Sequence, residues 1–223
     1  MYLIRLLEGS SINMEQLLNG VYSDDYFIDY RANTEDPLAM MYQSGYLTIK
    51  DVFRQEDGSL LYRLDYPNIE VKRGFVTMLC NNYFGSREDA GGVAQKMVRC
   101  LIEHRLDDMR VLLDQYLSSI DYEMRKDKEY HFQYTLYLIF SLMSSFGVVV
   151  ERHTSQGRSD LIVETSKYVY IFEFKLGGSA KEALKQIEER QYAKPYLSDS
   201  RPVKKIGVSF GRKSGTIDDW RVE

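Results

Sequence analysis

The chain has 223 residues, a formal net charge of −4 and 44% hydrophobic residues, which is enough apolar material for one large or two modest domains. This acidic balance excludes a generally basic protein that coats nucleic acid. The charge is uneven, however, because residues 1–120 contain 12 Lys or Arg against 18 Asp or Glu, whereas residues 121–223 contain 17 against 15. The C-terminal part therefore has room for a local basic patch.

Cysteine usage and apolar runs narrow the class of protein further. Cys80 and Cys100 are far apart and have no CxxC partner, so we expect small core residues, not a disulfide framework or a zinc site. Residues 1–5 are too short an apolar start for a signal peptide. The longest apolar run, 136–150, is broken by serines and a glycine and is too short to cross a bilayer. We therefore expect a soluble, cytoplasmic protein with no membrane contact.

The part of the chain up to residue 85 is predicted to be a small α+β region with a helix, a β-hairpin and a second helix. These elements span residues 37–44, 46–53 with 60–64, and the stretch from 68 onward. Asn68 is suited to cap the second helix. A helix, a hairpin and a helix can form a winged-helix-like unit that reads DNA. This segment is acidic and has no basic recognition helix, so we interpret its tyrosines as packing residues.

A polar break at residues 85–89 separates this region from a stretch, 90–120, whose apolar residues recur at helical spacing. We expect one long helix there. His104 lies on its apolar stripe, and we interpret it as a core histidine with a hydrogen-bond partner. The break predicts two domains, residues 1–85 and 86–223.

The C-terminal part predicts an α/β order of helix, strand, strand, strand, helix and strand. The ranges are 127–145, 147–153, 159–165, 168–176, 179–196 and 203–210. A short polar turn joins the second and third strands. Ser179 and Glu182 have the spacing of a capping box, which would open the second helix.

Charged residues interrupt the apolar strands of this part. Side chains alternate along a strand, so Glu173 and Lys175 share one sheet face with Val169 and Ile171. Asp160 interrupts the preceding strand. Buried charge is costly, so such groups persist when they pair with each other, bind a metal or take part in catalysis.

Two polar residues lie on the flanking helices, and the first of them is predicted to point toward the core. Glu129 precedes Phe132 by three residues on the apolar face of the first helix. Gln186 shares a face with Ala183 on the second helix.

The set of polar residues resembles the motif of the PD-(D/E)XK nuclease superfamily. Asp160 is similar to the aspartate of that motif, and Glu173 with Lys175 is similar to its (D/E)XK element. Glu129 resembles the acidic residue that the family often has on its first helix, and Gln186 the glutamine on the helix after the motif. The leading proline is absent here. The resemblance implies a restriction-endonuclease-like αβββαβ core with a mixed sheet.

The same resemblance implies metal-assisted hydrolysis of nucleic-acid phosphodiester bonds. Asp160, Glu173 and Glu129 would bind Mg²⁺ or Mn²⁺ through hard oxygen atoms. Lys175 would hold the attacking water or offset charge on the phosphate, and Gln186 would support the site. DNA is favoured over RNA as the substrate. The basic residues expected to line a nucleic-acid path are Arg158, Lys181, Lys185 and Arg190.

A further resemblance extends over most of the chain. Residues 43–49, 66–72 and 206–210 are similar to segments in the C-terminal half of bacterial AAA-type ATPase-like proteins that end in a PD-(D/E)XK domain. This chain contains no GxxxxGK[ST] motif. The resemblance therefore implies a truncated member or a separately encoded tail, residues 1–85 being a remnant that follows an ATPase core, with an ATPase protein as a partner.

Two alternatives to an active nuclease remain open from the residues themselves. Asp160, Glu173 and Lys175 could form a buried salt-bridge cluster that only holds the sheet together. The domain could also be an inactive module that binds or regulates an ATPase partner or nucleic acid. The sequence does not indicate the oligomeric state.

Overall fold

The computed structural model divides the chain into two compact units, Met1–Leu79 and Cys80–Glu223. The described backbone covers residues 20–24, 27, 38–84, 89–119, 128–154 and 159–223. Side chains at 83–84, 128–133, 151–154 and 159–160 lie outside the description as well. The division between the units falls within one helix, and the assignment of domains to residues 1–85 and 86–223 stays a prediction.

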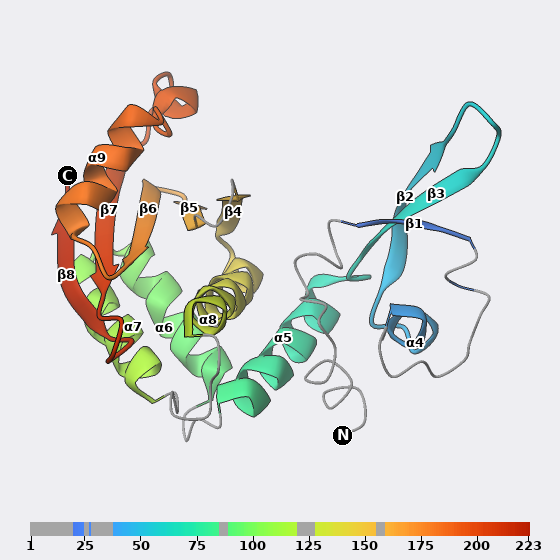
Figure 1. Cartoon of the computed structure of the whole chain (residues 1–223), viewed down its shortest axis with the longest axis horizontal. Helices are drawn as coiled ribbons and strands as arrows, with labels where there is room; N and C mark the ends of the chain where they lie inside the picture. Colours follow the sequence, from blue (N-terminus) through green and yellow to red (C-terminus); the bar gives the residue numbers. More distant parts are fainter. Residues whose placement is uncertain (1–19, 25–26, 28–37, 85–88, 120–127, 155–158) are drawn as a thin grey trace. The chain divides into compact units, whose positions relative to one another are not determined.

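The first unit contains a small antiparallel sheet, with one helix between its first two strands along the chain and one helix after its last strand (Figure 1). The strands pair in the order β1–β3–β2. The elements are β1 (Val21–Ser23), α4 (Leu38–Gln43), β2 (Thr48–Arg54), β3 (Leu60–Asp65) and α5 (Ile69–Phe84). The predicted hairpin and both predicted helices are confirmed, whereas β1 was not expected. Asn68 caps α5, since its Oδ1 accepts from the Val71 amide at 2.8 Å. Tyr66 is buried against Phe75, which supports a packing role for this tyrosine.

The second unit begins with two helices where the sequence pattern predicted one. They are α6 (Ala90–Ile102) and α7 (Leu106–Ser118). Helix α6 ends just before His104, whose φ of 55° lies in the left-handed region. Its amide donates to Leu101 O at 3.2 Å, and the Arg105 amide donates to Cys100 O at 2.8 Å, which is the Schellman pattern of a helix end. The expectation of one continuous helix was wrong, because the spacing of apolar residues does not reveal a single residue with a left-handed backbone conformation.

His104 has the hydrogen-bond partner that its apolar position suggested, although the residue is only half-buried. Its Nδ1 lies 2.9 Å from Tyr170 Oη, which in turn donates to Leu101 O at 2.8 Å. Because the single hydroxyl proton is used toward Leu101, Nδ1 is the donor in the first bond. The ring also stacks on Tyr168. These contacts fix the turn between α6 and α7 against the sheet.

A mixed five-stranded sheet follows, in the order β4–β5–β6–β7–β8, and only β6 and β7 are parallel. The elements are α8 (Lys128–Met143), η1 (Ser144–Phe146), β4 (Val149–Thr154), β5 (Ser159–Glu164), β6 (Val169–Leu176), α9 (Ala180–Glu189), η2 (Lys194–Tyr196), β7 (Val203–Phe210) and β8 (Ile217–Val222). The predicted order of elements and the mixed sheet are confirmed. Strand β8 was not expected, and α9 ends before 196, with Gln191 left-handed at φ 54°.

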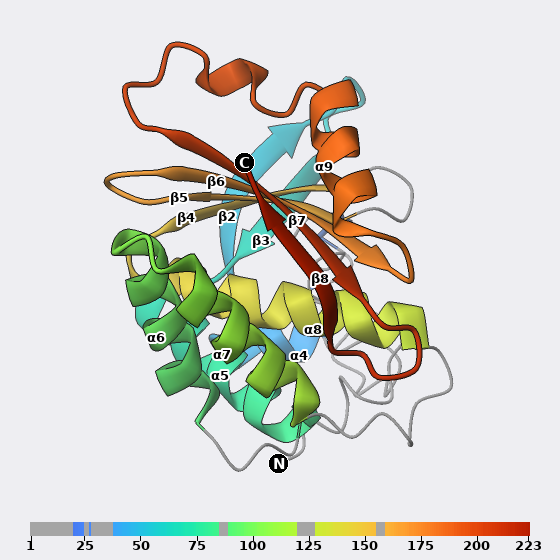
Figure 2. The same ribbon diagram turned by 90° about the vertical axis from the view of Figure 1, so that its left-hand side faces the viewer.

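Helices cover both faces of this sheet, with α9 on one side and α6, α7 and α8 on the other (Figure 2). On the α9 face, Val169 and Ile171 pack with Ile162, Leu184 and Ile187. The intervening residues of β6 face the other helices. These residues are Tyr170, Phe172 and Phe174, and Phe140 of α8 contacts the last two. Both faces of β6 are therefore packed in a hydrophobic core.

The two cysteines are buried and free, as expected of small core residues, with Cys80 0% and Cys100 2% exposed. Burial raises the pKa of the Cys80 thiol to about 12. Among the described residues, no helix is long and apolar enough to cross a membrane.

Candidate active site

Strand β6 places a carboxylate and an ammonium group at the end of the α9 core. Glu173 and Lys175 continue the inward series of Val169 and Ile171, as the alternation predicted. Glu173 is 0% exposed, whereas the Lys175 side chain is 23% exposed. The carboxylate is thus withdrawn from solvent, and the lysine lies where the core meets solvent.

Helix α9 lies close to the sheet at this position because Gly207 of β7 is the neighbour of Glu173 in the parallel ladder. A Cβ at Gly207 would lie only 3.0 Å from Leu184 Cγ and 3.1 Å from the Ala180 carbonyl carbon. Ser179 and Glu182 form the predicted capping box at the start of α9. The absence of a side chain at Gly207 sets the distance of α9 from the sheet, and the capping box fixes the first turn of the helix.

Lys175 joins the strand to the helix. Its Nζ donates to Glu173 Oε1 at 2.7 Å and also to Gln186 Oε1 on α9. Gln186 therefore lies on the side of α9 that faces the sheet. Glu173 and Lys175 lie on one strand and Gln186 on the following helix, and the fold brings the helix residue into contact with the lysine.

Two polar atoms in this cluster are buried without a hydrogen-bond partner in the described part of the chain. They are Glu173 Oε2 and Gln186 Nε2. Leaving a buried acceptor and a buried donor without hydrogen bonds costs free energy. A salt-bridge cluster with a purely structural role would avoid this cost by pairing every buried polar atom. The open carboxylate oxygen is suited to a cation, and the open amide N–H is suited to an oxygen of a ligand or water.

The backbone register brings Asp160 to this place. In the antiparallel ladder of β5 and β6, Asp160 is directly opposite Glu173. Glu129 lies on α8, which covers the other face of the sheet through Phe140. The side chains of Asp160 and Glu129 lie outside the described residues. Among the side chains that are described, no three His, Cys, Asp or Glu residues form a cluster for a metal ion.

The predicted nucleic-acid contacts on α9 are exposed but do not form a basic surface. Lys185 Nζ pairs with Glu189 at 3.2 Å, and Arg158 lies outside the described residues. The outer side of α9 and its end carry three cations and three carboxylates that are interspersed along the chain. They are Lys181, Lys185 and Arg190 with Glu182, Glu188 and Glu189.

Sequence reasoning overlooked Ser209, which lies beside Lys175 in the β6–β7 ladder. This serine is 1% exposed, and its hydroxyl donates to Gly178 O at 2.8 Å. It holds the turn that leaves β6 directly after Lys175. A serine inside the apolar run of β7 was the available signal.

The contact of the buried carboxylate, the lysine and the glutamine at the end of β6 is the arrangement that the family's motif would require. Residues 127–220 match the family model of the PD-(D/E)XK nuclease superfamily. The matched PD-(D/E)XK segment includes α8, the sheet from β4 to β7, and α9, and so contains Asp160, Glu173, Lys175 and Gln186.

The chain is also similar to a longer protein from Azotobacter chroococcum mcd 1, named "Uncharacterized protein in vnfD 5'region". The two are 30% identical over 192 residues, which cover 83% of this chain. The chain spans 37% of the length of that relative. The similarity therefore reaches well beyond the PD-(D/E)XK segment into the N-terminal unit.

Proposed function

We propose that this chain is a metal-dependent nuclease that hydrolyses phosphodiester bonds of nucleic acid, with DNA favoured over RNA. The observation that carries the proposal is the fully buried Glu173 carboxylate, with Oε1 held by Lys175 and Oε2 without a hydrogen-bond partner among the described residues. The match of residues 127–220 to the PD-(D/E)XK superfamily model supports the same conclusion.

The donor set fits Mg²⁺ or Mn²⁺. Glu173 offers a buried carboxylate oxygen with no hydrogen bond from the part of the chain that the structure describes. Directly opposite residues of an antiparallel ladder share a sheet face, so Asp160 would supply the second carboxylate. When bound, the ion would neutralise phosphate charge and lower the pKa of a water molecule. The support for Glu129 as a third ligand is weaker, because its helix lies on the opposite face of the sheet.

Lys175 and Gln186 have distinct roles in this proposal. The Lys175 ammonium, at the solvent boundary, holds the attacking water or offsets charge on the phosphate oxygens. Gln186 accepts from that ammonium, which fixes its direction, and its buried Nε2 can donate to an oxygen of the substrate or of water. The cluster thus presents donors to an anionic group from one side of the site.

The partner of the nuclease is proposed to be an ATPase domain or a separate ATPase protein. The support is the resemblance of residues 43–49 and 66–72 to ATPase-like proteins, together with the extent of the Azotobacter relative beyond the matched region. The alternative is an inactive domain that only binds a partner or nucleic acid. In that case the ion pair of Glu173 with Lys175 would have a structural role alone.

Cleavage assays decide between the two readings. Purified protein is incubated with plasmid DNA, single-stranded and duplex oligonucleotides and RNA in Mg²⁺ or Mn²⁺. We expect cleavage that is lost in Asp160→Ala and Lys175→Ala and kept in Lys167→Ala, a matched charge removal in the β5–β6 turn. Absence of cleavage with either ion, combined with no heat of Mn²⁺ binding by calorimetry, would show that the domain is not a metal-dependent nuclease.

A further inference from the structure

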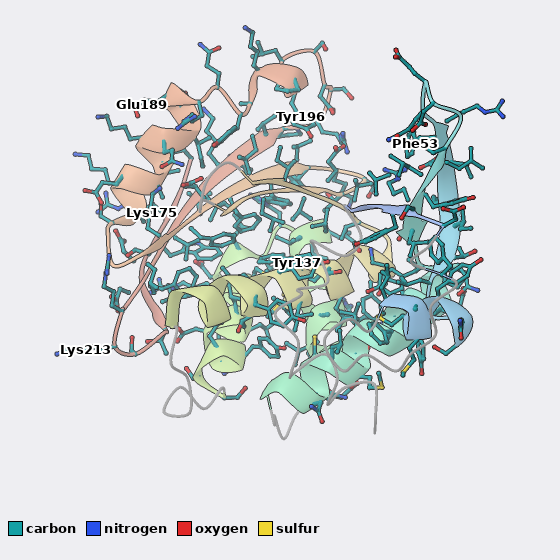
Figure 3. The ribbon with its side chains drawn as sticks, turned by 45° about the vertical axis from the view of Figure 1, so that its right-hand side comes forward. Phe53, Tyr137, Lys175, Glu189, Tyr196 and Lys213 are labelled. Carbon is teal, nitrogen blue, oxygen red and sulfur yellow. The ribbon has the colours of Figure 1, made fainter. Side chains whose placement is uncertain are left out.

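The turn between β7 and β8 carries two cations in a short segment bounded by glycines, Gly211 and Gly215. Arg212 and Lys213 are both exposed. The Gly211 amide donates to Thr216 O at 3.0 Å and the Gly215 amide to Gly211 O at 2.8 Å. Two backbone hydrogen bonds therefore fix the shape of the turn that presents these side chains. Figure 3 shows Lys213 at its tip, pointing away from the ribbon.

Arg212 lies over the turn that follows β6, the strand that carries Glu173 and Lys175. A Cβ at Gly177 would fall within 2.8 Å of Arg212 Cδ, and Gly177 has a φ of 69°. The next residue, Gly178, would place a Cβ 3.4 Å from Lys175 Cβ. The stems of Arg212 and Lys175 therefore border the same pair of glycines from two sides.

The backbone fixes these two cations relative to each other. The Gly177 amide donates to Phe210 O at 2.8 Å, and Ser209 Oγ donates to Gly178 O at 2.8 Å. The turn after β6 is thus tied directly to the strand that leads into Arg212. Neither the position of Arg212 nor that of Lys175 depends on a long flexible loop.

Arg212 and Lys213 have no ion-pair or hydrogen-bond partner among the described residues, in contrast to Lys185 and Lys205, which pair with glutamates. The nearest carboxylates along the chain have other roles or positions. Asp219 accepts from the Ala180 amide at 3.2 Å and from Arg221 Nε at 3.3 Å. Asp218 lies over Gly211, where a Cβ would be 3.0 Å from both of its carboxylate oxygens.

We propose that Arg212, assisted by Lys213, binds a backbone phosphate of the nucleic acid next to the one that is cleaved. A guanidinium group suits the two oxygens of a phosphodiester. Arg212 is exposed and has no carboxylate partner in the described part of the chain, so it is available for them. On the α9 surface, positive and negative side chains are interspersed, so this surface offers the phosphate backbone no comparable group of cations without carboxylates among them. This inference rests on the proposed nuclease function, because it takes the end of β6 as the place of cleavage.

Binding measured without cleavage tests the inference. A fluorescein-labelled DNA duplex is titrated with protein in Ca²⁺ in place of Mg²⁺, by anisotropy, at several salt concentrations. Arg212→Ala should weaken binding about tenfold and make the slope of log K against log[salt] smaller by about 0.9. Arg212→Lys should keep the slope and lose part of the affinity, because it keeps the charge without the planar fork.

Lys167→Ala is the matched control, because it removes one exposed cation from the other end of β6, about 20 Å from the site for a strand of this length. It should leave both affinity and slope unchanged. If Arg212→Ala equals wild type in affinity and slope while wild type still cleaves in Mg²⁺, the Arg212 inference fails and the nuclease proposal stands. If wild type neither binds nor cleaves DNA or RNA, both fail together. A loss in Lys167→Ala equal to that in Arg212→Ala would show general charge attraction and would overturn the assigned site.

Discussion

Gly207 of β7 and Ala180 of α9 approach so closely that no side chain fits between them: a Cβ on Gly207 would lie 3.1 Å from the Ala180 carbonyl carbon. Gly207 is also the ladder neighbour of Glu173. The distance between α9 and β6, on which the contact of Gln186 with Lys175 depends, is therefore set by a residue that carries no functional group.

Gly207→Ala should consequently destabilise the fold and disturb the site together. Inserting a methyl group into a filled core costs about 1–3 kcal/mol, and a shift of α9 would carry Gln186 away from Lys175. The urea midpoint measures the first effect and the rate of DNA cleavage the second.

Gly74→Ala is the control for this substitution. Gly74 lies in the exposed part of α5 with nothing within 4 Å of its Cβ direction, so alanine should raise stability by about 0.5–1 kcal/mol through helix propensity. Gly207→Ala behaving like Gly74→Ala would contradict the close approach of α9.

Lys175→Met should be destabilising even without substrate. The change leaves the fully buried Glu173 carboxylate with no cation, and breaking such a pair costs about 3 kcal/mol. Glu173→Gln added to Lys175→Met removes the uncompensated charge, so the double variant should recover most of the loss. Chemical denaturation of the four proteins gives the coupling free energy. Additive losses would mean that the two groups do not interact.

Mn²⁺ should stabilise the folded protein through the open oxygen of Glu173. At 100 times its dissociation constant, the ion should raise the free energy of unfolding by about 2.7 kcal/mol, seen as a higher Tm. Glu173→Gln should abolish the shift, whereas Glu182→Gln, which changes a capping carboxylate of α9, should retain it. An equal shift in Glu173→Gln would place the ion elsewhere.

The ion pair of Asp199 with Arg201 should make stability depend on pH in the acid range. Hydrogen bonds from Arg201 lower the pKa of Asp199 from its ordinary value of 3.8 to about 2. A folded-state pKa below the unfolded one adds stability above about pH 4, and this contribution is lost as the pH falls toward 2.

The difference in urea midpoint between wild type and Asp199→Asn should therefore be constant at neutral pH and shrink below about pH 4. In an Arg201→Gln background the same comparison should show a smaller pH dependence, because the Arg201 side-chain hydrogen bonds that are the largest cause of the lowered pKa are gone, whereas the bond from the backbone amide of residue 201 remains. A difference that is unchanged down to pH 2 would be inconsistent with the pair.

Tyr170→Phe should weaken the turn between α6 and α7. The change removes the donor to Leu101 O and the partner of His104 Nδ1, and it should cost about 1–2 kcal/mol. Tyr168→Phe keeps the ring that stacks on His104 and should cost much less. Equal losses in the two variants, measured by denaturation, would contradict a specific role of the Tyr170 hydroxyl group in holding this turn.

Local patterns were sufficient for much of the second unit. Alternation along β6 placed Glu173 and Lys175 on one face, and the Ser179 and Glu182 spacing located the start of α9. Periodicity did not reveal the left-handed residue at His104, so one helix was expected where the chain forms two. Strand β8 was missed because Ile217–Val222 contains three charged residues and pairs at the edge of the sheet, where one face can stay polar.

The sequence by itself determined which residues of β6 face inward and which helix face carries Gln186, because these follow from the periods of strand and helix. Tertiary structure decided that Gln186 meets Lys175, that a buried Glu173 oxygen has no partner within the described ranges, and that Arg212 lies over Gly177. These are contacts between segments distant in the chain. They depend on how closely α9 and the β7–β8 turn approach β6, and residue periodicity carries no information about that distance.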